Sequence, residues 1–202
     1  MSEKQGIFSI LRHPVVYEAV QQIFQADRNR KWFADTYVRA DPGNRVLDIG
    51  CGPANLLEHL PDVDYIGWEP NPAYIETAKK KYGARGSFNV GYFGETEAAS
   101  LPQVDIAVVS AVLHHLDDEQ ARHLYALLRK VVKPGGRVVS LDCAYIDRQN
   151  PLARLLVSLD RGQHARYPNA YTSIAAASFS DVTGDLIRQR FPPYTFWMMT
   201  AR

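Results

Sequence analysis

The chain has few cysteines and no long apolar run. Its 202 residues include two cysteines, Cys51 and Cys143, which is too few for a disulfide framework or a four-ligand zinc site. The longest apolar stretch, residues 106–113, is interrupted by Ser110 and is far too short to cross a bilayer. Residues 7–11 are likewise too short an apolar run for a signal peptide. We therefore expect a cytoplasmic protein with no membrane span and no structural metal.

An excess of charge of one sign is also absent. Twenty-three Lys and Arg stand against 22 Asp and Glu, for a formal net charge of +1. Non-specific nucleic-acid binding usually requires a basic excess on one face, so we expect no nucleic-acid partner. The sequence also contains no G-x-x-x-x-G-K-[ST] loop, so nothing in it supports hydrolysis of nucleoside triphosphates.

Length and composition are ordinary for a globular protein. Hydrophobic residues make up 46% of the chain and charged residues 22%. The length suits one well-buried domain over residues 1–202. Within it we expect an N-terminal helical lid over residues 1–41, a cofactor-binding core over 45–143, and a substrate-side segment with a C-terminal hairpin over 144–202.

Short apolar strands alternate with helical patterns in the central part of the chain. Strands are predicted over residues 45–49, 65–68, 87–93, 104–110 and 137–143, and helices over 54–60, 73–82 and from 117 to a stop at 133–136. Such alternation predicts an α/β fold with a doubly wound, mostly parallel sheet and helices on both faces. Ligands bind beyond the carboxyl ends of the strands in such sheets. Functional residues are therefore expected where these strands end.

The two ends of the chain have patterns of their own. A helical pattern begins at Pro14, residues 27–30 predict a break in it, and Trp32 resumes it. Another helical run covers residues 151–159. Two strands near residues 182–187 and 194–200 are joined by a short connection, so we expect an antiparallel pair that closes the sheet.

A glycine turn and a later acid predict a nucleoside site. Gly50, Cys51 and Gly52 lie between a predicted strand and a predicted helix, where glycine allows the backbone to approach a ligand closely. Glu69 ends the next strand, about 20 residues after Asp48, where an acid suits the hydroxyls of a ribose. An ordinary strand-to-helix turn is the alternative, but the combination with Glu69 favours a nucleoside cofactor.

Two residues in and beside the turn, Asn55 and Asp48, indicate which kind of nucleoside cofactor binds. Asn55 stands at the sixth position, where a dinucleotide fingerprint has Gly or Ala. Asp48 precedes the first glycine by two residues, and its carboxylate would repel a pyrophosphate but attract a cationic group. A sulfonium with an ammonium-bearing tail therefore fits better than NAD. An NAD-dependent oxidoreductase is kept as a less favoured alternative.

Several motifs in order resemble one family. Residues 46–52, Val-Leu-Asp-Ile-Gly-Cys-Gly, resemble the first motif of class I S-adenosylmethionine-dependent methyltransferases. Glu69 matches the acid that binds the ribose in that family, and residues 105–116 and 133–136 resemble its later motifs. The resemblance covers roughly residues 45–143. It implies a seven-stranded sheet whose last strand is antiparallel.

The resemblance also implies a cofactor site. S-adenosyl-L-methionine would be the cofactor and S-adenosyl-L-homocysteine the product. The glycine turn would line the methionine moiety, Asp48 would orient it, and residues 92–95 would border the adenine. The cofactor-binding residues predicted on this basis are Asp48, Gly50, Cys51, Gly52, Glu69, Pro70, Phe93, Gly94, Ser110, Ala111 and Tyr17.

His114 and His115 are the candidates for catalysis. Methyl transfer from a sulfonium is a direct displacement, so alignment of the reactants supplies much of the rate enhancement. Some nucleophiles also need a base, and both histidines directly follow the strand over residues 104–110. The alternative is that one packs locally while the other is solvated. Adjacent histidines point in different directions, which disfavours a two-histidine metal site, and we expect no metal.

The acceptor is expected to be small. The sequence offers no large insertion for a separate substrate domain, and residues 145–171 are rich in polar side chains. These side chains either bind a polar ligand or pair with one another. We therefore expect methyl transfer to O, N or C of a small polar molecule. A non-catalytic S-adenosylmethionine-binding partner subunit is the alternative.

Overall fold

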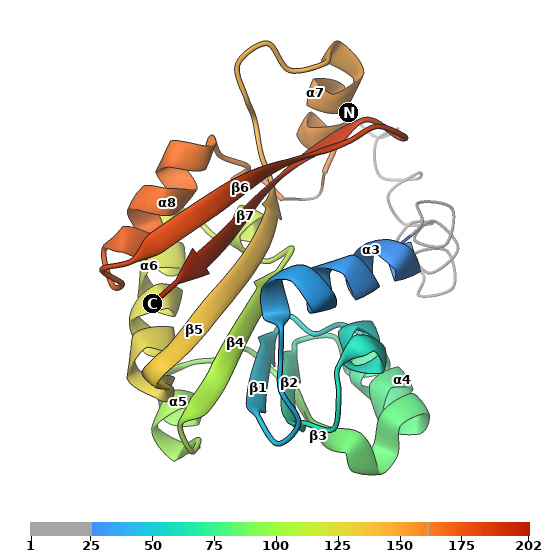
Figure 1. The fold of residues 1–202 in the computed structure, drawn as a ribbon, viewed down its shortest axis with the longest axis vertical. Helices are drawn as coiled ribbons and strands as arrows, with labels where there is room; N and C mark the ends of the chain where they lie inside the picture. Colours follow the sequence, from blue (N-terminus) through green and yellow to red (C-terminus); the bar gives the residue numbers. More distant parts are fainter. Residues whose placement is uncertain (1–25, 161) are drawn as a thin grey trace, which may run out of the picture.

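The computed structural model describes residues 26–160 and 162–202, which form a seven-stranded sheet flanked by helices (Figure 1). The strands are β1 (Arg45–Ile49), β2 (Asp64–Glu69), β3 (Gly86–Val90), β4 (Val104–Ser110), β5 (Val132–Cys143), β6 (Val182–Gln189) and β7 (Tyr194–Ala201), in the order β3-β2-β1-β4-β5-β7-β6. Strands β1 to β5 pair in parallel, and β7 runs antiparallel to both β5 and β6. The predicted fold class is confirmed.

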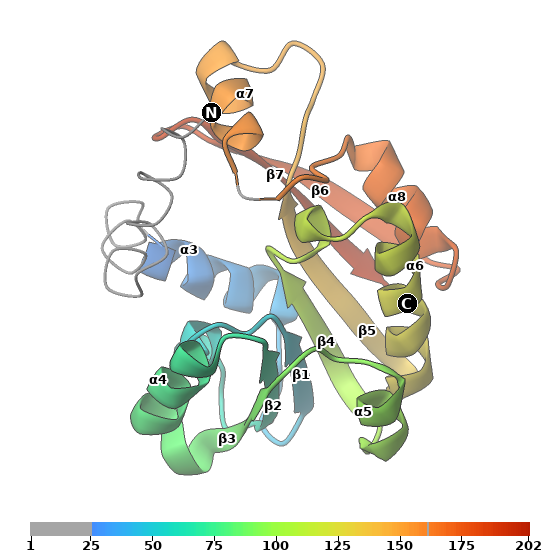
Figure 2. The ribbon, with the colours of Figure 1, turned by 180° about the vertical axis from the view of Figure 1, so that it is seen from behind.

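Helices cover both faces of the sheet (Figure 2). The α-helices are α3 (Ala26–Phe33), α4 (Pro72–Tyr82), α5 (Glu95–Ser100), α6 (Asp118–Val131), α7 (Pro151–Ser158) and α8 (Pro168–Ala176). The short helices are π-helical η1 (Ala34–Val38) and 3-10 helices η2 (Asn55–His59), η3 (Gly83–Arg85) and η4 (Leu113–His115). Within the described residues, no helix has the length and hydropathy needed to cross a membrane.

Two apolar cores result from the alternation of side chains along the strands. In β4, Ile106 and Val108 pack with the cluster of α3, η2 and α4, whereas Ala107 and Val109 pack with α6 and α8. All four of these residues are fully buried. This burial on both faces is typical of a central parallel strand.

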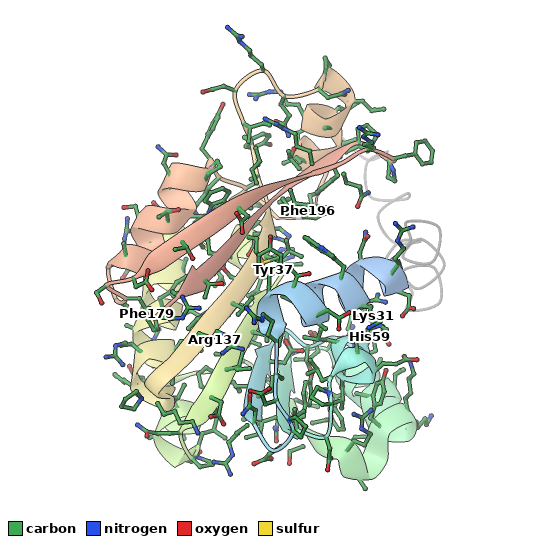
Figure 3. The ribbon with its side chains drawn as sticks, viewed as in Figure 1. Lys31, Tyr37, His59, Arg137, Phe179 and Phe196 are labelled. Carbon is green, nitrogen blue, oxygen red and sulfur yellow. The ribbon has the colours of Figure 1, made fainter. Side chains whose placement is uncertain are left out.

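The segment α3–η1 is held over the sheet by contacts at both of its ends (Figure 3). Near its start, His59 Nε2 of η2 lies 2.9 Å from Asp27 Oδ1. At the end of η1, Arg137 Nη2 donates to the backbone carbonyls of Val38 and Arg39. The helix α3 therefore lies at a fixed place beside the carboxyl ends of β1 and β4.

Two predictions at element boundaries are wrong. Residues 27–30 do not break a helix, because α3 runs through them with its charged side chains outward and Phe33 buried. The helix predicted to stop at residues 133–136 does end just before them, at Val131, but the strand predicted from residue 137 already begins at Val132, which pairs with Val104 before a bulge. In both places tertiary packing overrides the local signal.

Other elements differ in length or type from the prediction. The predicted strand over 87–93 ends at Val90, since Gly91 takes a φ of 140° that ends the extended run. The predicted helix over 54–60 is the 3-10 helix η2. No helix was predicted at α5 or α8, which are short and bury few side chains.

Candidate functional site

The carboxyl ends of β1, β2 and β4 meet at one edge of the sheet. Ile49 of β1 pairs with Trp68 of β2 and with Val109 of β4. The residues that end these three strands, or directly follow them, are therefore neighbours in space, as the sequence predicted. They supply the glycine turn, Glu69 and Ser110.

The glycine turn leaves room for a ligand on one side. Gly50 and Gly52 have φ values of 70° and 53°, in the left-handed region that favours glycine. A Cβ on Gly50 would lie 2.5 Å from Cγ2 of Val112, so this glycine is required by packing. A Cβ on Gly52 would meet nothing within 4 Å, so open space adjoins the turn at this residue.

Glu69 ties the end of β2 to the glycine turn. Its Oε2 accepts the N–H of Gly52 at 3.2 Å, and its Oε1 accepts the N–H of Asn71 at 2.9 Å. A carboxylate has about four acceptor positions, so each oxygen retains capacity for one further donor. The carboxylate is thus oriented by the backbone and is able to accept two hydroxyl groups of a sugar.

Asp48 is the buried acid behind the turn. It is 3% exposed, and its Oδ2 accepts the hydroxyl of Tyr65 at 2.6 Å. Burial raises the pKa of Asp48 to about 7 although the Tyr65 hydrogen bond opposes this effect. A cationic ligand group nearby would favour the ionised carboxylate, so the site is suited to a cation.

A small cavity of about 160 Å³ brings together most of the predicted turn residues. Asp48, Gly50, Cys51, Gly52, Ser110 and Ala111 all line it, with Arg30, Phe33, Pro53, Asn55 and Leu56. Glu69 joins this group through its bond to Gly52. The thiol of Cys51 has its pKa raised by burial and nearby acids, so it is un-ionised at neutral pH.

The remaining predicted cofactor residues lie away from this cavity. Pro70 is exposed after β2, and the ring of Phe93 packs edge-on against Trp68 at 6.3 Å between centroids. Gly94 precedes α5, where its N–H is accepted by the carboxylate of Glu97 at 3.0 Å. Their roles stay predictions. Tyr17 and the predicted helix that begins at Pro14 lie outside the described residues.

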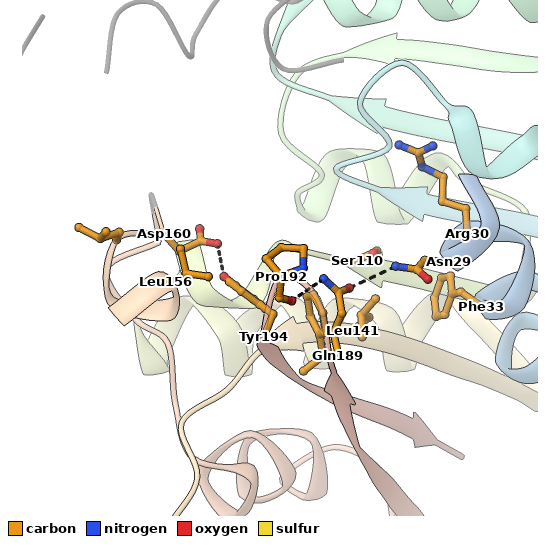
Figure 4. A pocket seen from close by; sticks show the side chains of 12 residues that line it. Asn29, Arg30, Phe33, Ser110, Leu141, Leu156, Asp160, Gln189, Pro192 and Tyr194 are labelled. Carbon is orange, nitrogen blue, oxygen red and sulfur yellow. Dashed lines mark hydrogen bonds between the residues drawn. The ribbon is translucent and has the colours of Figure 1, made fainter. Parts of the chain in front are cut away.

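A larger cavity of about 510 Å³ adjoins the first one (Figure 4). The two share Arg30, Phe33 and Ser110. The other residues that line it are Asn29, Leu141, Leu156, Leu159, Asp160, Gln189, Pro192, Tyr194 and Phe196. The lining is mainly apolar, and it comes from α3, β5, α7 and the β6–β7 hairpin.

An acid–base cluster lies at the wall of the larger cavity. The buried ring of His114 is held between two carboxylates, with Nδ1 2.7 Å from Asp142 and Nε2 3.2 Å from Asp160. Tyr194 donates its hydroxyl to the second oxygen of Asp160 at 2.6 Å. Of the two carboxylates, only Asp160 lines the cavity.

The charges in this cluster follow from the contacts. Burial by itself lowers the pKa of His114, but the hydrogen bonds with Asp142 and Asp160 outweigh burial and raise the pKa to about 9. Burial raises the pKa of Asp160, but its bonds with His114 and Tyr194 outweigh burial and hold the pKa below the ordinary value. At neutral pH the cavity is therefore faced by a carboxylate that is supported by an imidazolium.

The structure places the two predicted catalytic histidines differently. His114 is buried, whereas His115 is exposed, with its ring centroid 4.2 Å from that of His114. The backbone N–H of His114 also bonds to Asp142 at 3.1 Å. In this structure neither ring lines the larger cavity, and Asp160 stands between His114 and that cavity.

His114, Cys143 and Asp160 form a group that could hold a metal ion. Their potential ligand atoms lie within 4.8 Å of one another. His114 Nε2 already pairs with Asp160, however, and burial raises the pKa of the Cys143 thiol to about 12. A metal would have to replace these contacts, so the group is better described as a hydrogen-bonded acid–base cluster.

Arg166 fixes the turn that carries His114. Its buried guanidinium donates to Asp118 Oδ1 at 2.8 Å and to the carbonyls of Leu113 at 2.9 Å, Leu116 at 2.6 Å and His164 at 2.9 Å. The N–H of His164 in turn bonds to the carbonyl of His114. The polar side chains of residues 145–171 were expected either to bind a polar ligand or to pair with one another. Arg166 pairs with other groups of the protein.

The sequence did not identify Asp142 or Tyr194 as site residues. Asp142 lies near the carboxyl end of β5, an edge where functional residues are expected. Tyr194 begins β7, and only the antiparallel pairing of β7 with β5 places it near Asp160. The place of Asp142 near a strand end could therefore have identified it as a site residue. Nothing in the local sequence around Tyr194 could have done so.

Comparison with known proteins gives consistent matches. Residues 46–136 match a family model described as a methyltransferase domain. An uncharacterized methyltransferase from Geobacillus sp. (strain WCH70) is 29% identical over 129 residues, which is 63% of this chain and 60% of that protein. Acetylserotonin O-methyltransferase from Gallus gallus is 29% identical over 129 residues, 59% of this chain and 36% of that protein. The chain thus spans less than two thirds of either relative.

Solved structures share the fold. A SAM-dependent methyltransferase from Archaeoglobus fulgidus superposes with a TM-score of 0.71 at 19% identity, covering 92% of this chain and 99% of that one. The methyltransferase SibL in its apo form gives a TM-score of 0.71 at 20% identity, covering 93% of this chain and 57% of that one. At these identities the likeness shows the fold alone.

Proposed function

We propose that the chain is a class I S-adenosylmethionine-dependent methyltransferase, because residues 46–136 match a methyltransferase domain, and that it transfers a methyl group to a small molecule. One observation carries the proposal. The cavity beside the glycine turn adjoins a larger cavity, and the two share Arg30, Phe33 and Ser110. A methyl donor in the first and an acceptor in the second would meet at these shared residues.

The residues around the smaller cavity fit the cofactor. S-adenosylmethionine, when bound, supplies a methyl group that is already activated by its sulfonium. Glu69 would accept the ribose hydroxyls, the open side of Gly52 would receive the methionine moiety, and Asp48 would favour its cationic groups. The matches to methyltransferases support the same cofactor.

The larger cavity supports an acceptor that is mainly apolar. Its volume of about 510 Å³ lies within the usual range for small-molecule sites. The sequence favoured a polar acceptor because of residues 145–171, but two of the charged residues there, Asp160 and Arg166, are engaged within the protein. We therefore propose an apolar molecule with one hydroxyl directed at Asp160. The name of the O-methyltransferase relative supports an oxygen acceptor.

Asp160 is the proposed catalytic residue. Its carboxylate would accept a hydrogen bond from the acceptor hydroxyl and so orient the oxygen. Methylation makes the hydroxyl proton strongly acidic, so even a carboxylate with a low pKa is able to take it. His114 and Tyr194 hold the carboxylate in place and are positioning residues. The predicted role of His114 as a direct base is the competing assignment.

Calorimetric titration tests the cofactor. Saturable binding of S-adenosylmethionine and S-adenosylhomocysteine is expected, with no binding of NAD. Glu69→Ala should weaken binding by about 10- to 100-fold, because hydrogen bonds to a charged group contribute about 1.5–3 kcal/mol. Glu69→Asp, which keeps the charge but shortens the reach, serves as a matched variant. A preference for NAD would overturn the proposal.

Turnover distinguishes an enzyme from a binding subunit. Purified protein incubated with S-adenosylmethionine and a panel of apolar phenols and alcohols should release S-adenosylhomocysteine. Tight cofactor binding without product from any acceptor would instead favour the non-catalytic alternative.

We also propose that the protein acts in the cytoplasm, because its sequence has only two cysteines and no long apolar run.

A further inference from the structure

A third cavity is lined by η1, by the residues that follow it, and by β5, β6 and the end of β7. Its volume is about 510 Å³, and it shares no lining residue with the two cavities described above. Tyr37 of η1 and Arg137 of β5 mark its position (Figure 3). The lining is mainly polar and consists of Asp35, Thr36, Tyr37, Arg39, Ala40, Asp41, Arg137, Asp185, Thr200 and Arg202. A ligand bound here would therefore be distinct from the methyl donor and the acceptor.

Three arginines line this cavity, and none of them forms an ion pair with an acid that also lines it. Arg202 pairs at 3.5 Å with Asp181, which lies outside the cavity. Nη2 of Arg137 donates to the backbone carbonyls of Val38 and Arg39. The guanidinium of Arg39 has no hydrogen-bond or ion-pair partner among the described residues. Most N–H donors of the three guanidinium groups are therefore available to a ligand.

Two of the three acids that line the cavity are engaged by other groups. Asp35 Oδ2 pairs with Lys31 at 2.8 Å. Asp185 Oδ2 accepts the hydroxyl of Tyr37 at 3.2 Å, which leaves its second oxygen as an acceptor. Asp41 is the remaining acid of the lining. The cavity therefore offers carboxylate acceptors as well as arginine donors.

The guanidinium groups repel one another across the cavity wall. Burial lowers the pKa of Arg137, and the charges of Arg202 and Arg39 lower it further, which outweighs the opposite effect of Asp41 and Asp105. Arginine keeps its charge in spite of such a shift. An anion beside the three arginines would relieve this repulsion, and guanidinium groups bind phosphate and carboxylate through pairs of N–H donors.

The backbone beside the cavity has an uncommon conformation. η1 is a π-helix, a rare type that is frequent at functional sites. Arg39, which ends it, has a φ of 46°, in the left-handed region that residues other than glycine seldom adopt. Its N–H bonds to the carbonyl of Ala34 at 2.8 Å, and its carbonyl accepts Arg137 at 2.9 Å. The place from which the Arg39 side chain extends is thus fixed by the backbone.

We propose that this cavity binds a small phosphorylated sugar, with its phosphate group held by Arg39, Arg137 and Arg202. The planar fork of a guanidinium matches two phosphate oxygens, which favours phosphate over a spherical anion such as chloride. The sugar hydroxyls would donate to the carboxylates of Asp41 and Asp185. The volume of about 510 Å³ lies within the range for small-molecule sites and exceeds what a phosphate ion alone would fill.

Calorimetric titration of the full-length protein tests the site with ribose 5-phosphate, inorganic phosphate and ribose as probes, in a buffer free of phosphate and sulfate. Ribose 5-phosphate should bind saturably, inorganic phosphate more weakly, and ribose not measurably. Arg39→Gln should weaken the binding of ribose 5-phosphate by about tenfold or more, because it removes charge-assisted hydrogen bonds. Arg28→Gln removes an exposed arginine of α3 outside the cavity and should leave the affinity unchanged. Equal affinity for inorganic phosphate would overturn the assignment to a phosphorylated sugar.

Chemical modification of arginine locates the bound phosphate in the unsubstituted protein. Phenylglyoxal modifies accessible guanidinium groups, and peptide mapping by mass spectrometry identifies them. Ribose 5-phosphate should protect Arg39 and Arg202 and leave Arg28 reactive, whereas S-adenosylmethionine should protect none of the three.

Three results would each overturn the proposal: no binding of either phosphate probe at millimolar concentration, an equal loss of affinity in Arg39→Gln and Arg28→Gln, or no protection of Arg39 and Arg202. Because this cavity shares no residue with the cavity beside the glycine turn, these results do not depend on the proposed methyl transfer.

Discussion

Burial of the Asp48 carboxyl group favours binding of a cationic ligand but lowers the stability of the folded protein at neutral pH. Its pKa is raised from 3.8 to about 7, chiefly by burial. The folded state therefore binds this proton more tightly than the unfolded state, and the contribution of Asp48 to stability falls as the pH rises from about 4 to 7. A cation beside the carboxylate would favour its ionised form.

Asp48→Asn should separate stability from affinity. The variant removes the buried charge and retains an oxygen to accept the Tyr65 hydroxyl. At pH 8 its free energy of unfolding should exceed that of the wild type by roughly 1–3 kcal/mol, with little difference at pH 4. Its affinity for S-adenosylmethionine should fall. Denaturant titrations at the two pH values measure the stability difference, and a loss of stability at pH 8 would contradict this account.

Asp160 and His114 give opposite predictions for the pH dependence of turnover. If Asp160 takes the proton, kcat should be nearly constant between pH 6 and 8 and should fall above about pH 9, where His114 loses its charge. If neutral His114 is the base, kcat should instead rise about tenfold per pH unit up to pH 9. A rising profile would reassign the catalytic role to His114.

Substitution of Asp160 tests the same assignment. Asp160→Asn should lower kcat by about 100-fold or more, the usual effect of losing a general base, and leave cofactor affinity unchanged. Tyr194→Phe removes only the hydrogen bond that orients this carboxylate, so its effect should be smaller. An unchanged kcat in Asp160→Asn would exclude the proposed mechanism.

At the scale of elements, one guanidinium connects the turn of His114 to the segment after α7. Arg166 bonds to three carbonyls and to Asp118 at the start of α6. Arg166→Ala should lower the free energy of unfolding by about 2–4 kcal/mol, since it leaves buried acceptors unpaired. Arg122→Ala removes an exposed guanidinium of α6 and should change stability by under about 0.5 kcal/mol. Denaturant unfolding of both variants gives the comparison.

The elements that the sequence predicted well are those whose pattern reflects burial. β4 was predicted to its ends, because a run apolar on both faces has few alternatives to a central strand. The helix predicted over residues 73–82 likewise corresponds to α4, which begins at Pro72 after the cap residue Asn71. By contrast, α3 was misjudged at residues 27–30, where a charged run proved to be the solvent face of a helix.

At the scale of the whole molecule, cofactor binding should raise the melting temperature Tm of the protein. A ligand that binds only the folded state at 100 times its Kd contributes about 2.7 kcal/mol, or roughly 5–10 °C in Tm for a chain of this size. S-adenosylmethionine should produce such a shift and NAD should not. Glu69→Ala should reduce the shift at the same ligand concentration. An equal shift with NAD would contradict the cofactor assignment.

The sequence by itself determined the parallel sheet, the glycine turn and the acid at Glu69, because these depend on local patterns and on the rule that strand ends share one edge. Only the tertiary structure decided that His114 is enclosed by Asp142 and Asp160, and that an apolar cavity adjoins the turn. The charge of His114 depends on Asp142 of β5 and on Asp160, two residues after the end of α7. Such contacts arise from strand pairing and packing between segments far apart in the chain, which leave no periodic signal in the sequence.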